Sequence, residues 1–418
     1  MKFVVFTLGC KVNKYESCSM MRKLSDNGFE VSDKLEYADA YIINTCSVTA
    51  EADKKSRQAV SRVLKYNPDA LVYIMGCSSQ NDFMQFAGKP NIRLISGVAS
   101  KCGMLDNIMS GISPLNEPPC LMARLPDEYE DEPIPFPSKT RGLLKVQDGC
   151  NNFCSYCIIP HLRGRSRSRA LDSVLSEAKI QAEYTKELVV TGINISAYGK
   201  DIGITLTDLV NKLSEVNVRK RFGSLECAAI DEGLLAAMKR ADFCDHFHLS
   251  LQSGSDAVLK AMNRKYDCKT FLQKIDLIRK YFPDAGITTD IICGFPAETE
   301  ENHKETVEFV KKATFSGGHV FVYSKREGTP AAKLPQIENS VKEGRAAEIS
   351  ALIAKSEKQF MEQRKSKVYP VYLENIEDGE SVGYTSNYIK VYCDCQKEKE
   401  IVNLKLGEIY KEGVKAYE

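Results

Sequence analysis

The sequence has almost no net charge, no long hydrophobic run and no segment with the layout of a signal peptide. Its 57 lysines and arginines nearly balance 56 aspartates and glutamates, which leaves a formal charge of +1. A chain-wide basic surface for nucleic acid is therefore excluded, and any binding of RNA would depend on local patches. No apolar run reaches the roughly 18–20 residues that a membrane-spanning helix needs. We expect a cytoplasmic protein.

The chain has fifteen cysteines but lacks the small size of a disulfide-stabilised secreted protein. With 418 residues, 43% of them hydrophobic, it is long enough for two or three domains with hydrophobic cores. In a reducing compartment cysteines serve as metal ligands or as core residues. Their positions along the chain therefore decide how we interpret them.

Prolines mark the clearest boundary. Seven of the 15 prolines fall between residues 113 and 138, together with an acidic run at 127–132. Proline lacks an N–H and fixes φ, so this stretch is predicted to be a linker. A second boundary follows a charged helical stretch at 339–365. We therefore predict domains at 1–112, 139–365 and 366–418.

Strand-like and helical segments alternate between these boundaries. Repeated β-α units imply a parallel sheet with right-handed crossovers, and six of them predict a partial (β/α)6 barrel. The predicted strands are 143–147, 188–191, 223–227, 247–251, 287–292 and 319–323, and the helices are 172–185, 207–216, 231–241, 255–264, 269–281 and 298–313. Chemistry in such folds lies at the carboxyl ends of the strands, where we place Cys150, Asn194, Glu226, Gln252, Asp290 and Tyr323.

The first domain repeats this pattern on a smaller scale and predicts a Rossmann-like, doubly wound α/β fold. The predicted strands 3–8, 41–44 and 71–75 are followed by Cys10, Cys46 and Cys77. The carboxyl ends of parallel strands line one edge of a sheet, so the three thiols are expected to converge. We interpret them as ligands of a metal cluster; the alternative is three buried thiols, since cysteine is frequent in cores.

A second group of cysteines lies close together in the sequence. Cys150, Cys154 and Cys157 form a C-x3-C-x2-C motif directly after a predicted strand. Three thiolates on one loop can ligate three irons of a 4Fe-4S cluster and leave the fourth iron open to a small molecule. A structural zinc site would need a fourth ligand at short spacing, for which His161 is the only nearby candidate. The motif therefore predicts an open 4Fe-4S cluster.

Four arginines follow this motif in a segment without acidic residues between Asp148 and Asp172. We interpret Arg163, Arg165, Arg167 and Arg169 as a positive patch that clamps a carboxylate or an RNA phosphate. The alternative is an ordinary solvated face.

The last 53 residues have alternating segments and turn signals that predict a small antiparallel β-barrel. Seven lysines stand against ten acidic residues there, a net charge of −3. A general single-strand binding surface should be basic. RNA binding by this domain would therefore depend on Tyr384, Tyr388, Lys390 and their neighbours, or on shape.

These motifs together resemble the radical S-adenosylmethionine (SAM) superfamily and, within it, the methylthiotransferases. The C-x3-C-x2-C triad marks the superfamily, and residues 9–13 (Gly-Cys-Lys-Val-Asn) look like the MtaB-type subgroup. The resemblance covers essentially the whole chain and implies an N-terminal domain with three dispersed cysteines, a radical SAM barrel and a C-terminal TRAM barrel. Further matching stretches are 191–194, 249–255, 290–296 and 323–330, where Glu327 departs from the proline that the family often has.

The resemblance implies an enzyme that adds a methylthio group to C2 of N6-threonylcarbamoyladenosine at position 37 of tRNA. It implies two 4Fe-4S clusters, one held by Cys150, Cys154 and Cys157 and an auxiliary one held by Cys10, Cys46 and Cys77. SAM would bind the first of these and contact Gly192, Asn194, Gln252, Asp290 and Arg165. An aromatic C–H is not acidic enough for a general base, so a cofactor radical would break it.

The same resemblance implies the partners. They are the tRNA anticodon stem-loop and a one-electron reductase such as flavodoxin or ferredoxin, and the enzyme is expected to be a monomer. Within the same reaction, the substrate could instead be isopentenyladenosine in tRNA or an aspartate of a ribosomal protein, against which Lys11 and Val12 argue. From another class, the chain could be a two-cluster electron carrier with an RNA-binding tail. That carrier would need two fully ligated clusters, whereas each cysteine triad is one ligand short.

Overall fold

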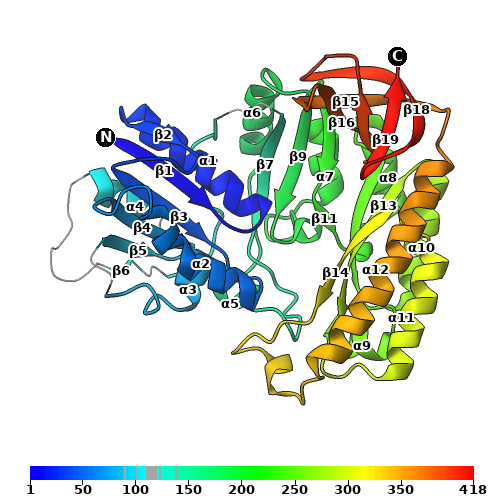
Figure 1. Cartoon of the computed structure of the whole chain (residues 1–418), viewed down its shortest axis with the longest axis horizontal. Coiled ribbons are helices and arrows are strands. Elements are labelled where there is room, and N and C mark those ends of the chain that lie inside the picture. Colours follow the sequence, from blue (N-terminus) through cyan, green and yellow to red (C-terminus); the bar gives the residue numbers. More distant parts are fainter. Residues whose placement is uncertain (89–90, 100, 110–119, 122–123, 137–139) are drawn as a thin grey trace. The chain divides into compact units, whose positions relative to one another are not determined.

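The structure is a computed structural model that describes residues 1–88, 91–99, 101–109, 120–121, 124–136 and 140–418. These residues form two compact units (Figure 1). Unit 1 comprises Met1–Phe136, Gln147–Arg169 and Ser324–Thr329, and unit 2 comprises Pro137–Val146, Ala170–Tyr323 and Pro330–Glu418. Of the predicted linker, residues 113–119, 122–123 and 137–138 lie outside the described residues. The three predicted domain ranges stay predictions. None of the described helices is long and apolar enough to cross a membrane.

Unit 1 is built on a six-stranded parallel sheet with the order β2-β1-β3-β4-β5-β6. The chain leaves β1 for one side of the sheet and then continues from β3 on the other side, which is the flavodoxin-like form of the doubly wound fold. The predicted α/β class is confirmed. The strands are β1 (Lys2–Thr7), β2 (Glu30–Ser32), β3 (Ala40–Thr45), β4 (Leu71–Gly76), β5 (Ile92–Ser96) and β6 (Cys120–Leu121).

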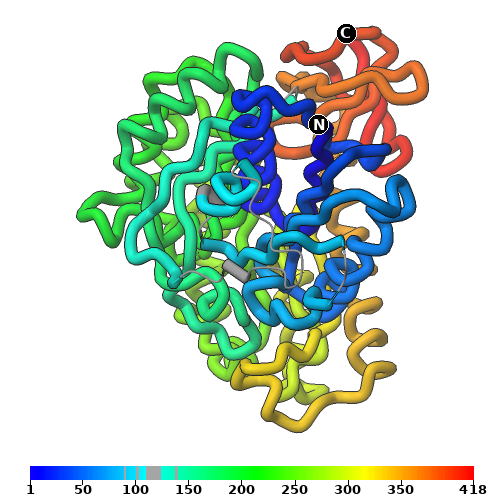
Figure 2. Tube along the Cα trace, turned by 90° about the vertical axis from the view of Figure 1, so that its left-hand side faces the viewer, coloured from blue at the N-terminus to red at the C-terminus, as the bar shows by residue number. Residues whose placement is uncertain are grey.

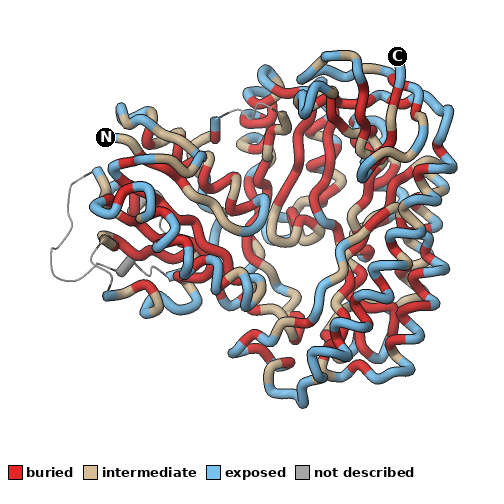
Figure 3. Tube along the Cα trace, viewed as in Figure 1, coloured by how far each residue is buried: buried red, intermediate tan, exposed pale blue. Residues whose placement is uncertain are grey.

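Helices cover both faces of this sheet. Successive strand residues alternate between two cores: Phe3 and Val5 pack with α1 (Lys11–Asp26) and α4 (Lys101–Met109), and Val4 packs with α2 (Ala50–Val63). Figure 3 shows the strands of unit 1 buried along most of their length. A parallel sheet with both faces covered is expected to have such continuous apolar strands.

Two segments from later in the chain complete unit 1. The first carries α5 (Ile159–Arg163) and β8 (Arg167–Ser168), and β8 pairs antiparallel with Gln147 and Asp148. Ile158 and Leu162 of this segment pack against Cys77. In the second segment, Ser324 Oγ accepts a hydrogen bond from the Ala50 N–H at 3.1 Å. Both groups of candidate cysteines therefore belong to unit 1.

Unit 2 contains the repeated β-α units. One sheet holds β10 (Arg219–Phe222), β9 (Glu187–Gly192) and β7 (Arg141–Asp148) in that order. The other holds β11 (Ser224–Leu225), β12 (His246–Gln252), β13 (Gly286–Cys293) and β14 (Gly317–Val322). Only Gly223 separates β10, which pairs with β9, from β11, which pairs with β12. The six strand positions confirm the partial (β/α)6 barrel. The single strand predicted at 223–227 is wrong: two short strands, β10 and β11, stand there on either side of Gly223.

The helices of unit 2 present one apolar side to the strands. Figure 1 shows α10, α11 and α12 side by side, and the same helices alternate between buried and exposed residues in Figure 3. Ile275, Val310 and Ile349 contribute the buried sides to a core shared with Leu249 of β12. The helices are α6 (Leu171–Ala182), α7 (Leu206–Leu213), α8 (Glu232–Arg240), α9 (Asp256–Ala261), α10 (Cys268–Tyr281), α11 (Glu300–Ala313) and α12 (Asn339–Glu362).

The C-terminal part of unit 2 is the predicted barrel, closed in the order β15-β16-β17-β19-β18. Figure 2 follows the chain through it in orange and red up to the C-terminus. Tyr384 and Tyr388, which we expected to face RNA, stack on each other with ring centres 4.8 Å apart, and Tyr388 stacks on His246 of β12. These rings join the barrel to the sheet. The strands are β15 (Val368–Glu377), β16 (Glu380–Thr385), β17 (Lys390–Cys393), β18 (Glu400–Tyr410) and β19 (Gly413–Tyr417).

Candidate functional site

The first candidate site lies where three adjacent strands of unit 1 end. Cys46 follows β3 directly, Cys77 follows β4 directly, and Cys10 comes three residues after β1. The strands are in register there, with Thr7 beside Asn44 and Thr45 beside Gly76. β1 and β3 also flank the point where the strand order reverses, which is where doubly wound folds bind ligands. The predicted convergence of the three strand ends is therefore present in the fold.

Gly9 allows the thiols to approach one another. Its φ is +100°, and a Cβ at this position would lie 2.7 Å from Cys46 Sγ. A side chain would need both a disfavoured backbone conformation and the space that the sulfur occupies. The chain before Cys10 is thus shaped around the second cysteine.

Buried amides hold the strand ends in place. Asn13 Nδ2 donates to the carbonyl oxygens of Leu8, at 2.8 Å, and of Thr45, at 3.0 Å. Asn44 Nδ2 donates back to the Asn13 carbonyl at 3.0 Å. These bonds tie the first turn of α1 to β1 and β3. Cys10, at the start of α1, is positioned by the same bonds.

The three thiols differ in exposure. Cys10 is exposed, at the positive N-terminal end of the 16-residue helix α1, whereas Cys46 and Cys77 are buried. Burial raises the pKa of the Cys46 thiol and raises that of Cys77 to about 11, although Arg163 opposes the rise at Cys77. Thiols bind metals as thiolates, so metal binding here would displace protons.

The second candidate site is the loop after β7. Gly149 has φ +69°, and a Cβ there would lie 1.9 Å from the Arg165 carbonyl oxygen, so the chain passes too closely for any side chain. The Cys150 N–H donates to the Gly164 carbonyl, and the Cys157 N–H donates to the Cys154 carbonyl, both at 3.0 Å. The C-x3-C-x2-C segment is therefore held as a tight loop at both ends.

The donor sets fit iron-sulfur clusters. Among the described residues, no three His, Cys, Asp or Glu side chains stand close enough to share a single metal ion. A four-iron cluster binds its cysteines through different irons, so its ligands spread over a wider space. His161, the alternative fourth ligand for zinc, is exposed, and its ring packs edge-on against Phe153 at 5.6 Å. Cys10, Cys46 and Cys77 would hold one cluster, and Cys150, Cys154 and Cys157 the other.

The predicted arginine patch is wrong for three of its four members. Arg163, Arg167 and Arg169 are buried. Arg163 pairs with Glu16 and Asp148, and Arg169 Nε pairs with Asp131 at 2.7 Å. The neutralising Glu16 and Asp131 come from outside the segment that we read as free of acids. Arg165 alone is exposed, with its guanidinium 4.6 Å from the centre of the Phe153 ring.

The other predicted SAM contacts lie in unit 2. Gly192 ends β9, Asn194 follows it, and Gln252 ends β12 with φ +72°, a left-handed backbone that marks a strained position. Asp290 was predicted at a strand end but lies inside β13. Its Oδ2 is 3.0 Å from His248 Nε2 on the neighbouring strand. The run of small and β-branched residues around Asp290 extends the strand past it.

Several polar residues near these sites escaped the sequence analysis. Asn13 is three residues after Cys10 on α1, and Glu16 is three residues after Asn13. This chain of i,i+3 neighbours is the signal that could have found them. Arg326 is buried in unit 1, where Nη2 contacts Asp53 Oδ2 at 2.5 Å and Ser47 Oγ at 2.6 Å. In unit 2, Arg264 pairs with Glu226 at 3.0 Å.

Two segments of the chain, each with one of the cysteine triads, match known protein families. Residues 144–310 match the Radical SAM superfamily, and residues 2–97 match a family described as "Uncharacterized protein family UPF0004". The first match contains the C-x3-C-x2-C loop and strands β9 to β13. The second contains Cys10, Cys46 and Cys77.

Relatives match the chain over nearly its whole length. The threonylcarbamoyladenosine tRNA methylthiotransferase MtaB of Bacillus subtilis is 37% identical over 431 residues, covering 97% of this chain and 94% of the relative. A tRNA-2-methylthio-N(6)-dimethylallyladenosine synthase of a Thermoanaerobacter species is 34% identical over 393 residues, covering 91% of this chain and 83% of the relative.

A solved structure has the same fold at low identity. It is the radical S-adenosylmethionine methyltransferase TsrM from Kitasatospora setae, determined with cobalamin and a 4Fe-4S cluster bound. Its TM-score is 0.56 at 14% identity, covering 79% of this chain and 77% of TsrM. The fold, the two cysteine triads and the full-length relatives agree, and the chain belongs to the radical SAM tRNA methylthiotransferase family, in its MtaB-type branch.

Proposed function

We propose that this enzyme methylthiolates C2 of N6-threonylcarbamoyladenosine at position 37 of tRNA, in two SAM-dependent steps and with two 4Fe-4S clusters. The observation that carries the proposal is the pair of cysteine triads in unit 1. Each has three thiols, and each is positioned by buried hydrogen bonds or tight backbone approaches. We propose the cytoplasm as its location and a flavodoxin or ferredoxin as its electron donor, and we propose that it acts as a monomer.

The family uses SAM and 4Fe-4S clusters. When bound, the cluster on the C-x3-C-x2-C loop supplies the electron that cleaves SAM, which gives the radical that an unactivated C–H requires. Cys150, Cys154 and Cys157 would hold this cluster, and the tight turns at Gly149 and Gly164 fix their loop. Cys10, Cys46 and Cys77 would hold the cluster on the sulfur-donating side. Gly192, Asn194, Gln252, Asp290 and Arg165 are proposed to contact SAM.

Lys11 supports the choice of the threonylcarbamoyl substrate. It is exposed and lies directly after Cys10, at an end of α1 where a positive side chain opposes the helix dipole. The threonylcarbamoyl group ends in a carboxylate, whereas the dimethylallyl group is uncharged. A cation beside Cys10 could therefore bind the carboxylate of the threonylcarbamoyl group, whereas the dimethylallyl group offers it no charged partner.

The substrate choice can be tested at this lysine. With Lys11→Met, the preference for threonylcarbamoyladenosine over dimethylallyladenosine stem-loops should fall about tenfold, the scale of one charged hydrogen bond. Lys23→Met, at the other end of the same helix, is the matched control. An unchanged preference, measured as the ratio of kcat/KM for the two RNAs, would argue against this role.

The function itself is tested by anaerobic reconstitution with SAM, dithionite and an anticodon stem-loop that carries threonylcarbamoyladenosine. Mass spectrometry should detect 5′-deoxyadenosine and a methylthio mass gain on the RNA. Deoxyadenosine without modified RNA would reject the substrate, and the dimethylallyl stem-loop or a ribosomal-protein peptide would be tried next. Neither product, with both clusters verified by iron analysis, would favour an electron carrier.

A further inference from the structure

Arg163 of unit 1 is the largest fully buried side chain among the described residues, with 1% of its surface exposed. It ends α5, six residues after Cys157. A buried guanidinium is costly unless its donors and its charge are all matched. The partners of Arg163 therefore show what the fold uses it for.

All five N–H donors of Arg163 have acceptors. Nη1 reaches Glu16 Oε1 at 2.9 Å and Asp148 Oδ1 at 3.1 Å, and Nη2 reaches Asn13 Oδ1 at 2.8 Å and Glu16 Oε2 at 3.2 Å. The fifth donor, Nε, reaches Cys77 Sγ at 3.3 Å. The two carboxylates more than offset the single positive charge, so the bond to sulfur is not needed for neutrality.

These contacts connect the two cysteine triads. Cys77 belongs to the first triad, and Asn13 Oδ1, which Arg163 also contacts, lies 3.8 Å from Cys10 Sγ. Asp148 lies two residues before Cys150 of the second triad, and its Oδ1 accepts the Gly149 N–H at 2.7 Å. One side chain thus touches a ligand of one proposed cluster and the loop of the other.

We propose that Arg163 is a positioning residue that raises the reduction potential of the cluster held by Cys10, Cys46 and Cys77. This rests on the proposed function. Hydrogen bonds to cluster sulfurs stabilise the more negative, reduced state and so raise the potential. Arginine suits this position because its planar fork aims one donor at sulfur while the other four are engaged. Lysine has three donors on one atom and cannot reach all these acceptors.

The potential can be measured without catalysis. In the full chain carrying Cys150→Ala, Cys154→Ala and Cys157→Ala, the first triad is the remaining proposed cluster site, and its reduction is followed by EPR during a redox titration. Adding Arg163→Lys keeps the charge but removes the Nε–H bond. The fraction reduced at a fixed potential should fall about threefold to tenfold.

Two further variants separate a redox role from a structural one. Arg326→Lys changes another buried arginine of unit 1, which contacts Asp53 and Ser47 rather than a cysteine sulfur. The reduction potential of the cluster should be unchanged in this variant. If Arg163→Lys does not fold, Glu16→Gln with Arg163→Gln removes one charge of each sign and should also lower the potential. A folded, iron-loaded Arg163 variant with the potential of its parent overturns the inference. Failure of the parent itself to bind iron overturns the proposed cluster instead.

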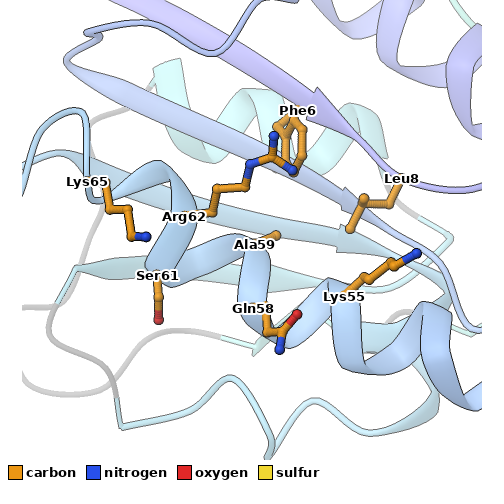
Figure 4. Close-up of a pocket in the computed structure, with 8 residues that line it drawn as sticks. All are labelled: Phe6, Leu8, Lys55, Gln58, Ala59, Ser61, Arg62 and Lys65. Atoms are coloured by element: carbon orange, nitrogen blue, oxygen red, sulfur yellow. The ribbon is translucent and has the colours of Figure 1, made fainter.

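A separate observation concerns a hollow on the surface of unit 1, beside α2. Its base is formed by Phe6 and Leu8, and Lys55, Arg62 and Lys65 stand around it (Figure 4). The Arg62 guanidinium lies over the Phe6 ring, 5.3 Å from its centre. Gln58, Ala59 and Ser61 complete the lining, so no acidic residue takes part.

The three cations of this hollow are exposed, and within the described part of the chain none is paired with a carboxylate. Three of the four arginines after the C-x3-C-x2-C motif, Arg163, Arg167 and Arg169, are buried, and the C-terminal barrel carries a net charge of −3. A chain of net charge +1 needs a local patch to hold RNA. We infer that this hollow binds phosphates of the tRNA substrate, an inference that rests on the proposed function.

The salt dependence of RNA binding tests this surface. Fluorescence anisotropy with the anticodon stem-loop gives Kd over a range of salt concentrations, and each lost phosphate contact lowers the slope of log K against log salt by about 0.7–0.9. Lys55→Gln, Arg62→Gln and Lys65→Gln together should weaken binding at least about tenfold and lower the slope by about 2. Lys269→Gln, Lys312→Gln and Lys355→Gln, on the outer helices of unit 2, are the control. Equal slopes in both triple variants overturn the inference, whereas a parent enzyme that binds no stem-loop overturns the proposed substrate.

Discussion

Each unit of the molecule contains a buried cluster in which several charges surround one central side chain, and the two clusters are of opposite design. In unit 1 the cation is central: Arg163 is surrounded by two carboxylates, an amide and a sulfur. In unit 2 the anion is central: Glu187 accepts from Arg219 Nε at 2.6 Å and from Arg221 Nε at 3.1 Å, and it lies 3.1 Å from Arg141 Nε.

The remaining contacts of each cluster reveal its purpose. Around Glu187, the arginines extend to the C-terminal barrel, where Arg219 reaches the Tyr384 carbonyl and Arg221 reaches that of Ser386. That cluster fastens one part of unit 2 to another. Arg163 instead ends at Cys77 Sγ. Two buried ion clusters of similar size thus have different roles. The donors left over in one cluster bond to backbone carbonyls and connect two parts of the fold, whereas the donor left over in the other bonds to a cysteine sulfur.

The largest effect should come from removing the sulfur that Arg163 contacts. Cys77→Ala should reduce methylthiolated RNA below detection by mass spectrometry, because one of three proposed cluster ligands is lost. Formation of 5′-deoxyadenosine should continue, since the C-x3-C-x2-C loop is intact. Cys18→Ala, in the same unit but outside both triads, should leave the product unchanged. Product formation by the Cys77 variant would exclude Cys77 as a ligand.

Removing the centre of the other cluster should affect stability rather than chemistry. Glu187→Gln leaves the buried Arg219 and Arg221 and the partly buried Arg141 without their shared anion, and it should lower the free energy of unfolding by about 3–5 kcal/mol. Its iron content and cluster spectrum should match those of the parent. Glu232→Gln, which breaks an exposed pair with Lys280, should cost less than about 1 kcal/mol. A cluster spectrum altered by Glu187→Gln would contradict the contrast between the units.

Acid should loosen unit 2 through the same carboxylate. Burial raises the pKa of Glu187, but Arg221, Arg219 and Arg141 lower it further, to about 2, from an ordinary value of 4.5. A depressed carboxyl pKa contributes stability above pH 4.5 that is lost as the pH falls toward 2. The unfolding temperature should drop over this range, and it should drop less in Glu187→Gln than in the parent. Equal acid sensitivity would assign the loss to other groups.

The smallest effect is expected at Arg165, the exposed member of the arginine series. Arg165→Gln should weaken binding of SAM or of the stem-loop by about threefold to tenfold, as loss of one exposed cationic contact does. Arg22 is a matched control, since its guanidinium also lies over a phenylalanine ring, that of Phe136, at 5.4 Å. If Arg165→Gln binds SAM and the stem-loop as tightly as Arg22→Gln does, Arg165 does not clamp either ligand.

The features predicted well from sequence were those set by local pattern. Cysteines that follow apolar runs mark the ends of strands, and parallel pairing then brings β1, β3 and β4 together at one edge. The alternation of strands and helices likewise predicted six strand positions in unit 2. The interruption at Gly223 went unseen because β10, the strand before it, reads Arg-Lys-Arg-Phe and does not look like a buried strand in sequence. Its arginines are buried because they pair with Glu187 on the neighbouring strand.

The features missed were those set by distant pairing. Arg163 belonged to a segment without acids, yet it is neutralised by Glu16, which is 147 positions earlier in the chain. No spacing rule connects the two residues. Asp290 was misplaced for a related reason, since its strand continues through it and its carboxylate is matched by His248 on the next strand. Where a charged side chain has its partner in another element, only the folded chain reveals whether it is exposed.

The close approach of Gly9 to Cys46 has a practical consequence for diagnosing damaged forms of this protein. Replacing Gly9 by any other residue would leave every sulfur of the chain in place, so a thiol titration of the denatured protein would report a full complement. The variant would nonetheless carry a displaced Cys46, because a Cβ at position 9 falls 2.7 Å from its sulfur. Counting cysteines, in a variant or in a relative, is therefore no substitute for inspecting the residue that precedes the first of them.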